Sequence, residues 1–446
     1  MEIKLFIDKV FEKAKSLELN EFEIYFLSSE NETIKVFKGE VETYTNSQNM
    51  GISFRVKINE KMGYSYTESL EEEDILPLIN TAIANAKIIE NLDIVDIYED
   101  KDEYATINSF NEKLSNITVE DKINFLLTAE KTALEMDPRV KSVNYCMLGS
   151  GYSENIIKNS KGLELFHNSN SIYAYIAVVV QDKDSIKNDS AYIVTREFSE
   201  MDPIKLSKEA VQNALNKLNS TSIESKNYKV VIQNDAFADL LGSMSGIFSA
   251  EAIQKGVSKF KGKLNTSVAS SIVTIIDNPH LENGYNSSPF DAEGVPTKEK
   301  KLIENGILKT YLHNLKTAKK DGLKTTGNAS KGGYKGTMGI SSFNLFLKEG
   351  TLPFENLLEF VENGVLITGF SGLHSGLNSI SGDFSLATEA FLIKNGKIKT
   401  PLDQITVAGN FFNLLKDIEK IGTDTKFNLS AVGSPSVVVK NLSISS

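Results

Sequence analysis

Apolar residues recur at helical spacing in four segments of the first half of the chain. In residues 2–17, six apolar side chains fall on one face of a helix, and residues 119–136 have a similar helical pattern. Residues 72–89 begin with acidic side chains, which the helix dipole favours at an N-terminus. Residues 202–219 carry Pro203 in the first turn, where proline is tolerated. The pattern predicts four helices.

Runs rich in β-branched and aromatic residues lie between these helices. Near the N-terminus, polar turn residues separate four short runs, at residues 21–28, 33–37, 41–46 and 51–58. Further on, residues 140–198 predict several longer antiparallel strands joined by polar turns. We therefore expect the first half to be α+β, with helices packed on an antiparallel sheet.

A polar segment, STSIESKN at residues 220–227, predicts a linker between two domains. We place an N-terminal α+β domain at residues 1–219. A β-rich domain with a few helices, the first of them at residues 235–246 and 247–259, follows at residues 228–446.

Asn-Gly pairs, which favour tight turns, occur at intervals along the second domain. Two of them have alternating apolar residues on both sides and predict hairpins at residues 302–312 and 390–400. A third pair, Asn363-Gly364, is expected to end a helix over residues 354–362, where a left-handed residue is wanted.

The charge of the chain argues against a nucleic-acid surface. The formal net charge is −11, whereas binding to phosphates needs clustered Lys and Arg. Arginine, whose guanidinium suits bases and phosphates, occurs at three positions: Arg55, Arg139 and Arg196. We expect no direct nucleic-acid partner.

Cysteine usage and the N-terminus predict a cytoplasmic protein. Cys146 is the single cysteine, so it forms no internal disulfide, as expected in a reducing compartment. The first residues mix charges with apolar side chains and do not have the pattern of a signal peptide. The longest apolar run, residues 172–180, is about nine residues long, where a membrane helix needs roughly 20. It predicts a buried strand.

Potential catalytic chemistry is sparse. The four histidines, of which His374 is the last, have no second His or Glu at metal-ligand spacing on a helix. Ser371 and His374 share the Gly-rich segment 369–376, which suggests a nucleophile beside its base. We favour a tightly turned or mobile loop, because the partners of a catalytic triad come together across the fold.

Asp291 and Glu293 stand two residues apart in the segment PFDAEGVPT. If this segment is extended, both carboxylates point to the same side and form acid–base machinery or one lip of a metal site. A polar turn before the next hairpin explains the same residues equally well. Both interpretations stay open.

Five segments of the second half, in this order, resemble the TldD/PmbA family: PFDAEGVPT (289–297), LIENGILKTYL (302–312), SGDFSLATEAFLIKNGKI (381–398), TVAGN (406–410) and GSPSVVVKNLSI (433–444). The first half, including residues 21–56, is similar to the family's first domain. The resemblance therefore covers nearly the whole chain and implies a metalloprotease-like C-terminal domain.

The resemblance also indicates which branch of the family the chain is similar to. TldD-type members carry H-E-x-x-x-H, whose histidines bind the catalytic metal together with a downstream cysteine. Counting back from Phe260 places Leu241, Gly242 and Gly246 at those three positions, and residues 238–250 contain no His, Cys or Glu. The chain thus resembles the PmbA branch, also called TldE.

This branch implies a subunit that pairs with a TldD-like partner in a cytoplasmic metalloprotease acting on small or unfolded peptides. The zinc-type metal is expected in the partner, and no cofactor is expected in this chain. Gly242, Gly246 and the serines beside them expose little side chain, so the helix could pack closely against its counterpart.

A peptide could be held by β-augmentation, which uses main-chain hydrogen bonds along an exposed strand edge. The candidate groove is the strand Ser341–Leu347, with Ser341, Asn344 and Phe346 as contact residues. Two other functions remain open. One is a self-sufficient peptidase that uses Asp291, Glu293 or His374, and the other is a homodimeric peptide-binding or regulatory protein.

Overall fold

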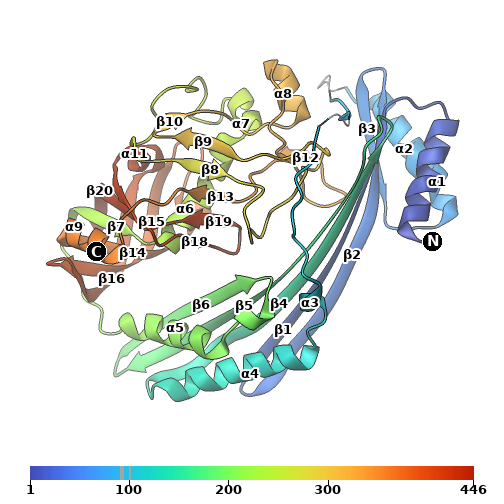
Figure 1. Ribbon diagram of the computed structural model, residues 1–446. Coiled ribbons are helices and arrows are strands. Elements are labelled where there is room, and N and C mark those ends of the chain that lie inside the picture. The colour runs from blue at the N-terminus through green and yellow to red at the C-terminus, as the bar shows by residue number, and fades with distance from the viewer. Residues whose placement is uncertain (91–94, 100–101) are drawn as a thin grey trace.

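The computed structural model describes residues 1–90, 95–99 and 102–446. Figure 1 shows a long curved sheet built by the N-terminal half of the chain, with the C-terminal half lying over one face of it. Helices and sheets occur in both halves, and the C-terminal half is rich in strands. The predicted α+β class is confirmed.

Six antiparallel strands form the N-terminal sheet, in the order β3-β2-β1-β4-β5-β6: β1 (Phe22–Phe37), β2 (Glu40–Ile58), β3 (Lys61–Thr67), β4 (Val140–Asn159), β5 (Glu164–Asp182) and β6 (Ser185–Thr195). The central strands pair over most of their length, so that Glu23 on β1 stands opposite Arg55 on β2 and Asn159 on β4. The apolar run 172–180 lies in β5, where buried and half-buried residues alternate.

The first hairpin corrects the prediction of four short strands. β1 and β2 are continuous, and the turn between them is at Lys38-Gly39, where both residues have positive φ (54 and 79°). Residues expected in turns pair across the hairpin instead, as where Gln48 Nε2 donates to Glu30 Oε1 at 3.0 Å. β2 is exposed from residue 40 to residue 50, where most of its side chains are polar. The backbone ladder continues regardless of side-chain polarity.

Four helices cover the outer face of this sheet, the face turned away from the C-terminal half: α1 (Ile3–Ser16), α2 (Ile75–Ile88), α4 (Val119–Met136) and α5 (Pro203–Asn216). The four predicted helices are confirmed, three of them with slightly shorter ends. Alternate residues of the strands pack beneath them: Phe22 and Ile24 belong to the core under α1 and α2, and Leu148 and Ile176 to the core under α4 and α5.

Local sequence explains where two of these helices begin. The Thr118 hydroxyl accepts a hydrogen bond from Asp121 N, and the Asp121 carboxylate accepts one from Thr118 N, forming a capping box for α4. Asp202 caps α5, and Pro203 occupies its first position. A shorter helix, α3 (Glu112–Ser115), precedes α4. The single cysteine, Cys146, is buried beneath α4, and this burial raises its thiol pKa to about 12.

Two six-stranded sheets organise the C-terminal half. The first has the order β16-β15-β14-β7-β20-β17: β7 (Lys226–Ile232), β14 (Asn363–Ser371), β15 (Asp383–Lys394), β16 (Lys397–Asn410), β17 (Ile418–Ile421) and β20 (Val437–Ser445). β16 also pairs with β20, which closes five of these strands into a ring. β7 begins at Lys226, inside the predicted linker.

The second sheet has the order β10-β9-β8-β13-β19-β18: β8 (Ile275–Asp277), β9 (Lys300–Glu304), β10 (Ile307–Leu308), β13 (Leu345–Leu347), β18 (Lys426–Phe427) and β19 (Val432–Ser434). A small hairpin, β11 (Ala329–Lys331) with β12 (Met338–Ile340), lies beside the N-terminal sheet (Figure 1). Both predicted hairpins are confirmed, as β9–β10 and β15–β16.

Six helices accompany these sheets in the described C-terminal residues: α6 (Asn234–Met244), α7 (Ala250–Lys255), α8 (Leu315–Asp321), α9 (Phe354–Val361), α10 (Leu373–Gly376) and α11 (Phe411–Lys416). α6 lies at the centre of the main core, where Phe237, Leu240, Leu241 and Met244 are fully buried. Within the described residues, no helix is both long and apolar enough to span a membrane.

The end of α9 corrects another prediction. The residue with positive φ after the helix is Glu362 (φ 58°), and Asn363 and Gly364 already belong to β14, opposite Lys394 and Ile393. Glycine is needed at 364 for packing. A Cβ there would lie 2.2 Å from the Lys229 carbonyl oxygen on the neighbouring strand β7.

Candidate functional site

Three tyrosines, Tyr145, Tyr173 and Tyr175, line a cavity on the inner face of the N-terminal sheet, the face that looks toward the C-terminal half in Figure 1. On β5, Tyr173 and Tyr175 alternate with Ala174 and Ile176, which are buried on the outer face. Tyr145 on β4 is 53% exposed. A tyrosine has an apolar ring and a polar tip, so a half-exposed row of them suits contact with a ligand better than simple solvation.

A cavity of about 860 Å³ lies between this face and the C-terminal half. We call it the tyrosine cavity. Of the eleven described residues that line it, four are tyrosines and none is Asp, Glu, Lys, Arg or His. The lining consists of Tyr145, Met147, Ser171, Tyr173, Tyr175 and Val194 from the sheet, and of Tyr285, Asn286, Leu429, Ser430 and Ala431 from the C-terminal half.

The loop of residues 428–432, which we call the anchor loop, forms one wall of this cavity. Asn428 Oδ1 accepts hydrogen bonds from the backbone N–H groups of Ser430 and Val432, both at 3.0 Å. Its Nδ2 donates to Asp239 Oδ1 on α6 at 2.8 Å. Ala431 has a φ of 58°, an unfavourable conformation for a residue with a Cβ, which the surrounding contacts must maintain. The loop holds Leu429, which is 48% exposed, at the cavity.

A smaller cavity of about 340 Å³ shares Tyr285 and Asn286 with the tyrosine cavity. We call it the serine cavity, because seven serines line it: Ser153, Ser169, Ser287, Ser288, Ser330, Ser341 and Ser342. The shared wall is fixed where the Tyr285 hydroxyl donates to the Val194 carbonyl at 2.9 Å and Arg196 Nη2 donates to the Gly284 carbonyl at 2.8 Å. Burial lowers the pKa of His167, which also lines this cavity.

Asp291 reaches the serine cavity, but its carboxylate holds a turn together. Its Oδ1 accepts from the backbone N–H groups of Glu293 and Val295, at 2.9 and 3.0 Å, and its Oδ2 accepts from Ala329 N at 2.8 Å. Burial raises its pKa, which these three hydrogen bonds oppose. The segment is therefore a buried turn, which agrees with the turn, the second of the two interpretations that the sequence leaves open. The Asp291 carboxylate accepts from backbone N–H groups that a neighbouring strand would otherwise pair with.

Glu293 belongs to a buried ionic cluster that joins the two halves of the chain. Its Oε1 lies 3.8 Å from Arg55 Nη1, and Arg55 Nε lies 2.8 Å from Glu23 Oε1. These three side chains are at most 5% exposed. Glu293 Oε2 accepts from Leu315 N at 2.8 Å, while Oε1 accepts no hydrogen bond from the described residues. Burial raises the pKa of Glu293, despite the opposing charge of Arg55.

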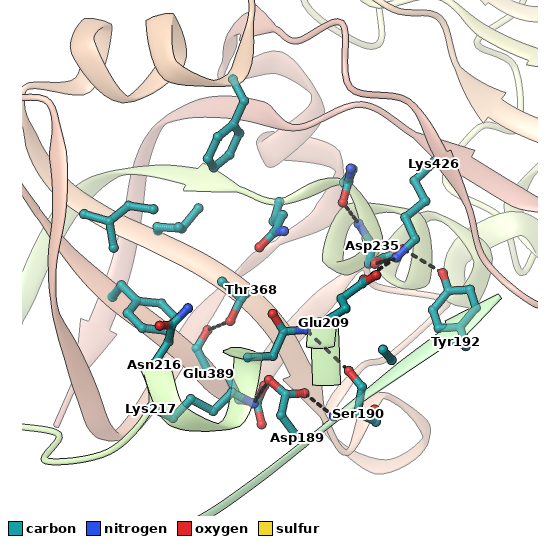
Figure 2. A pocket seen from close by; sticks show the side chains of 18 of the residues that line it. Asp189, Ser190, Tyr192, Glu209, Asn216, Lys217, Asp235, Thr368, Glu389 and Lys426 are labelled. Carbon is teal, nitrogen blue, oxygen red and sulfur yellow. Dashed lines mark hydrogen bonds and ion pairs between the residues drawn. The ribbon is translucent and has the colours of Figure 1, made fainter. Parts of the chain in front are cut away.

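A polar cavity of about 790 Å³ lies farther along β6 (Figure 2). Lys217 bridges Asp189, at 2.8 Å, and Glu389, so one ammonium links the N-terminal sheet to β15. On the opposite side, Lys426 lies 2.7 Å from Asp235 Oδ2 and 4.5 Å from the centre of the Tyr192 ring. The carboxylates that line this polar cavity thus neutralise lysines from both halves of the chain, and these ion pairs join the two halves.

The three positions that the sequence resemblance aligns with a metal motif, Leu241, Gly242 and Gly246, lie on or just after α6. Leu241 is fully buried in the core, Gly246 is exposed in the turn after the helix, and Gly242 packs on β19, where a Cβ would lie 3.3 Å from Val432 Cγ2. Leucine and glycine side chains have no donor atom, so these residues do not fit a zinc ion.

His374 lies on α10, which packs against α6 and β15, and it lines neither the tyrosine nor the serine cavity. The structure therefore brings Asp291 and Glu293 together but does not add His374 to them. Across the described residues, no group of three or more His, Cys, Asp or Glu side chains is arranged to hold a metal.

The expected exposed strand at Ser341–Leu347 is wrong. β13 covers residues 345–347, and it pairs with β8 on one side and with β19 on the other, so it has no free edge. Phe346 is paired on both sides, and Asn344 is fully buried, with Nδ2 donating to the Asn278 carbonyl at 2.8 Å. Ser341 does line the serine cavity.

The residues of the tyrosine cavity are absent from the candidates that the sequence suggests. A signal exists in the alternation of tyrosines with small or aliphatic residues through 173–176, which marks one face as aromatic. The second wall, at residues 285–286 and 429–431, comes from two distant segments, so it emerges only from the fold.

The comparisons agree with this architecture. Models of three PmbA/TldA metallopeptidase domains match residues 22–86 (domain 1), 112–218 (central domain) and 225–446 (C-terminal domain). A metalloprotease PmbA homolog of Haemophilus influenzae is 28% identical, over 90% of this chain and 86% of that protein.

Two crystal structures are similar along the whole chain. A Thermotoga maritima protein named as a putative modulator of a DNA gyrase is 32% identical, with a TM-score of 0.93 and complete coverage of both chains. TldE from Thermococcus kodakarensis has a TM-score of 0.91 at 22% identity, covering 99% of this chain and 100% of TldE, and shows the shared fold. This chain belongs to the TldD/PmbA family of metalloprotease-type proteins.

Proposed function

We propose that this chain is the non-catalytic, PmbA/TldE-like subunit of a cytoplasmic metalloprotease that acts on small or unfolded peptides. In this proposal a TldD-like partner supplies the zinc-type metal, and this chain carries none. The supporting observation is that Leu241, Gly242 and Gly246, which the sequence resemblance aligns with the metal motif of the TldD branch, have no donor atom in their side chains.

The surface beside these positions supports association with a partner. Asp239, Ser243 and Gly246 are exposed, and they project from one side of α6 and the turn that follows it. A Cβ at Gly246 would meet no atom within 4 Å. Small residues at such a position let another backbone approach closely. In the proposal, the partner's corresponding helix packs here.

Replacing Gly246 by leucine tests this packing. The variant is expected to fold as the parent does, because the added side chain projects into open space in this chain. It is expected to weaken association with a TldD-type partner by roughly tenfold or more, the scale of a central interface residue. Sedimentation velocity of mixtures gives the dissociation constant.

Gly332→Leu is the matched control, since Gly332 is also exposed and a Cβ added there would meet no atom within 4 Å. It should leave association unchanged. An intact complex with Gly246→Leu would remove α6 from the interface. A stable homodimer that does not bind the TldD-type partner would favour the alternative function, a homodimeric peptide-binding protein.

A further inference from the structure

We propose that the tyrosine cavity and the serine cavity form one cleft that binds an extended, uncharged segment of peptide. This inference deepens the proposed function and rests on it for one point, that the bound peptide is then cleaved by the metalloprotease. The binding itself is a property of this chain alone, so it can be tested separately.

The apolar contacts come from two facing walls. Tyr145, Tyr173 and Tyr175 line the cavity from the sheet, and Leu429 of the anchor loop lines it from the C-terminal half. A Cβ at Gly149 would lie 2.4 Å from the Tyr173 ring, so this ring packs against Gly149 on the neighbouring strand β4. Aromatic and aliphatic side chains of a ligand gain most from such surroundings.

The lining selects against charged side chains. No Asp, Glu, Lys, Arg or His lines the tyrosine cavity in the part of the chain that the structure describes. In the serine cavity, the oxygens of Asp291 already accept three backbone N–H groups, and His167 packs against Phe290 with ring centres 6.0 Å apart. A charged group entering the cleft would lose water without meeting a dedicated counter-ion, which is unfavourable.

The length and polar groups of the cleft favour a peptide over a compact small molecule. The two cavities adjoin at Tyr285 and Asn286, which line both. Ser171, Ser341 and Ser430 are distributed along them with Asn286, and their hydroxyl and amide groups can both donate and accept hydrogen bonds. A peptide backbone offers both kinds of group at every residue, whereas a single aromatic molecule would occupy one cavity.

The walls are held in place before any ligand enters. Asn428 fixes the anchor loop to α6 with one side-chain hydrogen bond and braces the loop internally with two more. The hydrogen bonds of the Tyr285 hydroxyl and of the Arg196 guanidinium fix the segment that contains Tyr285 to the sheet. Such preorganisation reduces the loss of conformational freedom on binding.

Fluorescence offers a direct test, because the chain contains no tryptophan. The probe is a heptapeptide with blocked ends and one tryptophan among alanine and valine residues. We expect saturable binding to the full-length chain alone. Two peptides in which aspartate or lysine replaces the valines should bind at least roughly tenfold more weakly. N-acetyl-tryptophanamide should bind far more weakly than the heptapeptide.

Leu429→Asp should weaken binding of the neutral peptide by about tenfold or more, as expected for an anchor residue. Tyr145→Ser provides a second variant, and both original side chains are half-exposed, so folding should be preserved. Leu5→Asp is the matched control, since Leu5 is 50% exposed on α1, far from the cleft (Figure 1).

The inference is overturned if the chain alone binds no neutral peptide, if charged peptides bind equally well, or if the tryptophan derivative binds as tightly as the heptapeptide. Unchanged affinity in both cleft variants would overturn it too. A different result would contradict the proposed function. In that result, this chain still binds the peptide but does not associate with a TldD-type partner.

Discussion

Replacing Arg55 by methionine is expected to lower the free energy of unfolding by roughly 3–5 kcal/mol, the range for breaking a buried ion pair from one side. Arg55 is 4% exposed and stands between Glu23 and Glu293, which are also buried. Methionine fills similar space but leaves two buried carboxylates facing an apolar side chain. Urea unfolding followed by circular dichroism measures the loss.

Partial rescue would distinguish lost charge pairing from lost packing. Adding Glu23→Gln and Glu293→Gln to Arg55→Met removes the unpaired carboxylates, so the triple variant should be more stable than the single one. Lys226→Met serves as the control, because its partner Glu224 is on the surface and the urea midpoint should not move. A small loss in Arg55→Met itself, below about 1 kcal/mol, would show that the cluster does not hold the two halves together.

Replacing Asp291 by alanine is the second large effect we expect. The variant leaves the backbone N–H groups of Glu293, Val295 and Ala329 without their acceptor inside the protein. Each orphaned buried group is unfavourable by about 1–3 kcal/mol, so the loss should reach roughly 3 kcal/mol or more. Thermal unfolding of the full-length variant measures it.

Asp291→Asn separates a structural role from a catalytic one. Asparagine keeps the Oδ1 acceptor for Glu293 N and Val295 N and loses the acceptor for Ala329 N. Its stability should therefore lie between those of the alanine variant and the parent. In a mixture with a TldD-type partner, peptide cleavage should follow the amount of folded protein. A stably folded Asp291→Asn variant that abolishes cleavage would instead make Asp291 a catalytic residue.

Local pattern is a good guide to the helices and a poor one to the long hairpin. α4 begins and ends where its periodicity predicts, because Thr118 and Asp121 cap it and apolar residues recur on one face. The pattern divides β1 and β2 at polar segments, because a strand is usually recognised by one buried face. Here residues 40–50 of β2 are exposed, so pairing alone defines the strand.

The candidate site can be predicted only in part, for reasons of chain topology. The sequence identifies Asp291 and Glu293 as a pair, but their roles depend on Ala329, Leu315 and Arg55, which are distant in sequence. The neighbours of β13, which are β8 and β19, come from segments about 70 and 85 residues away. Periodicity reports which face of a strand is buried, but it does not report which strands stand beside it.

The most direct test of the proposed accessory role is metal analysis joined to a peptidase assay. Both are done on this protein alone, on a TldD-type partner alone, and on their mixture. We expect no stoichiometric metal and no cleavage with this chain alone, and cleavage by the mixture that exceeds the partner's own. Stoichiometric metal together with peptide cleavage by this chain alone would contradict the accessory role.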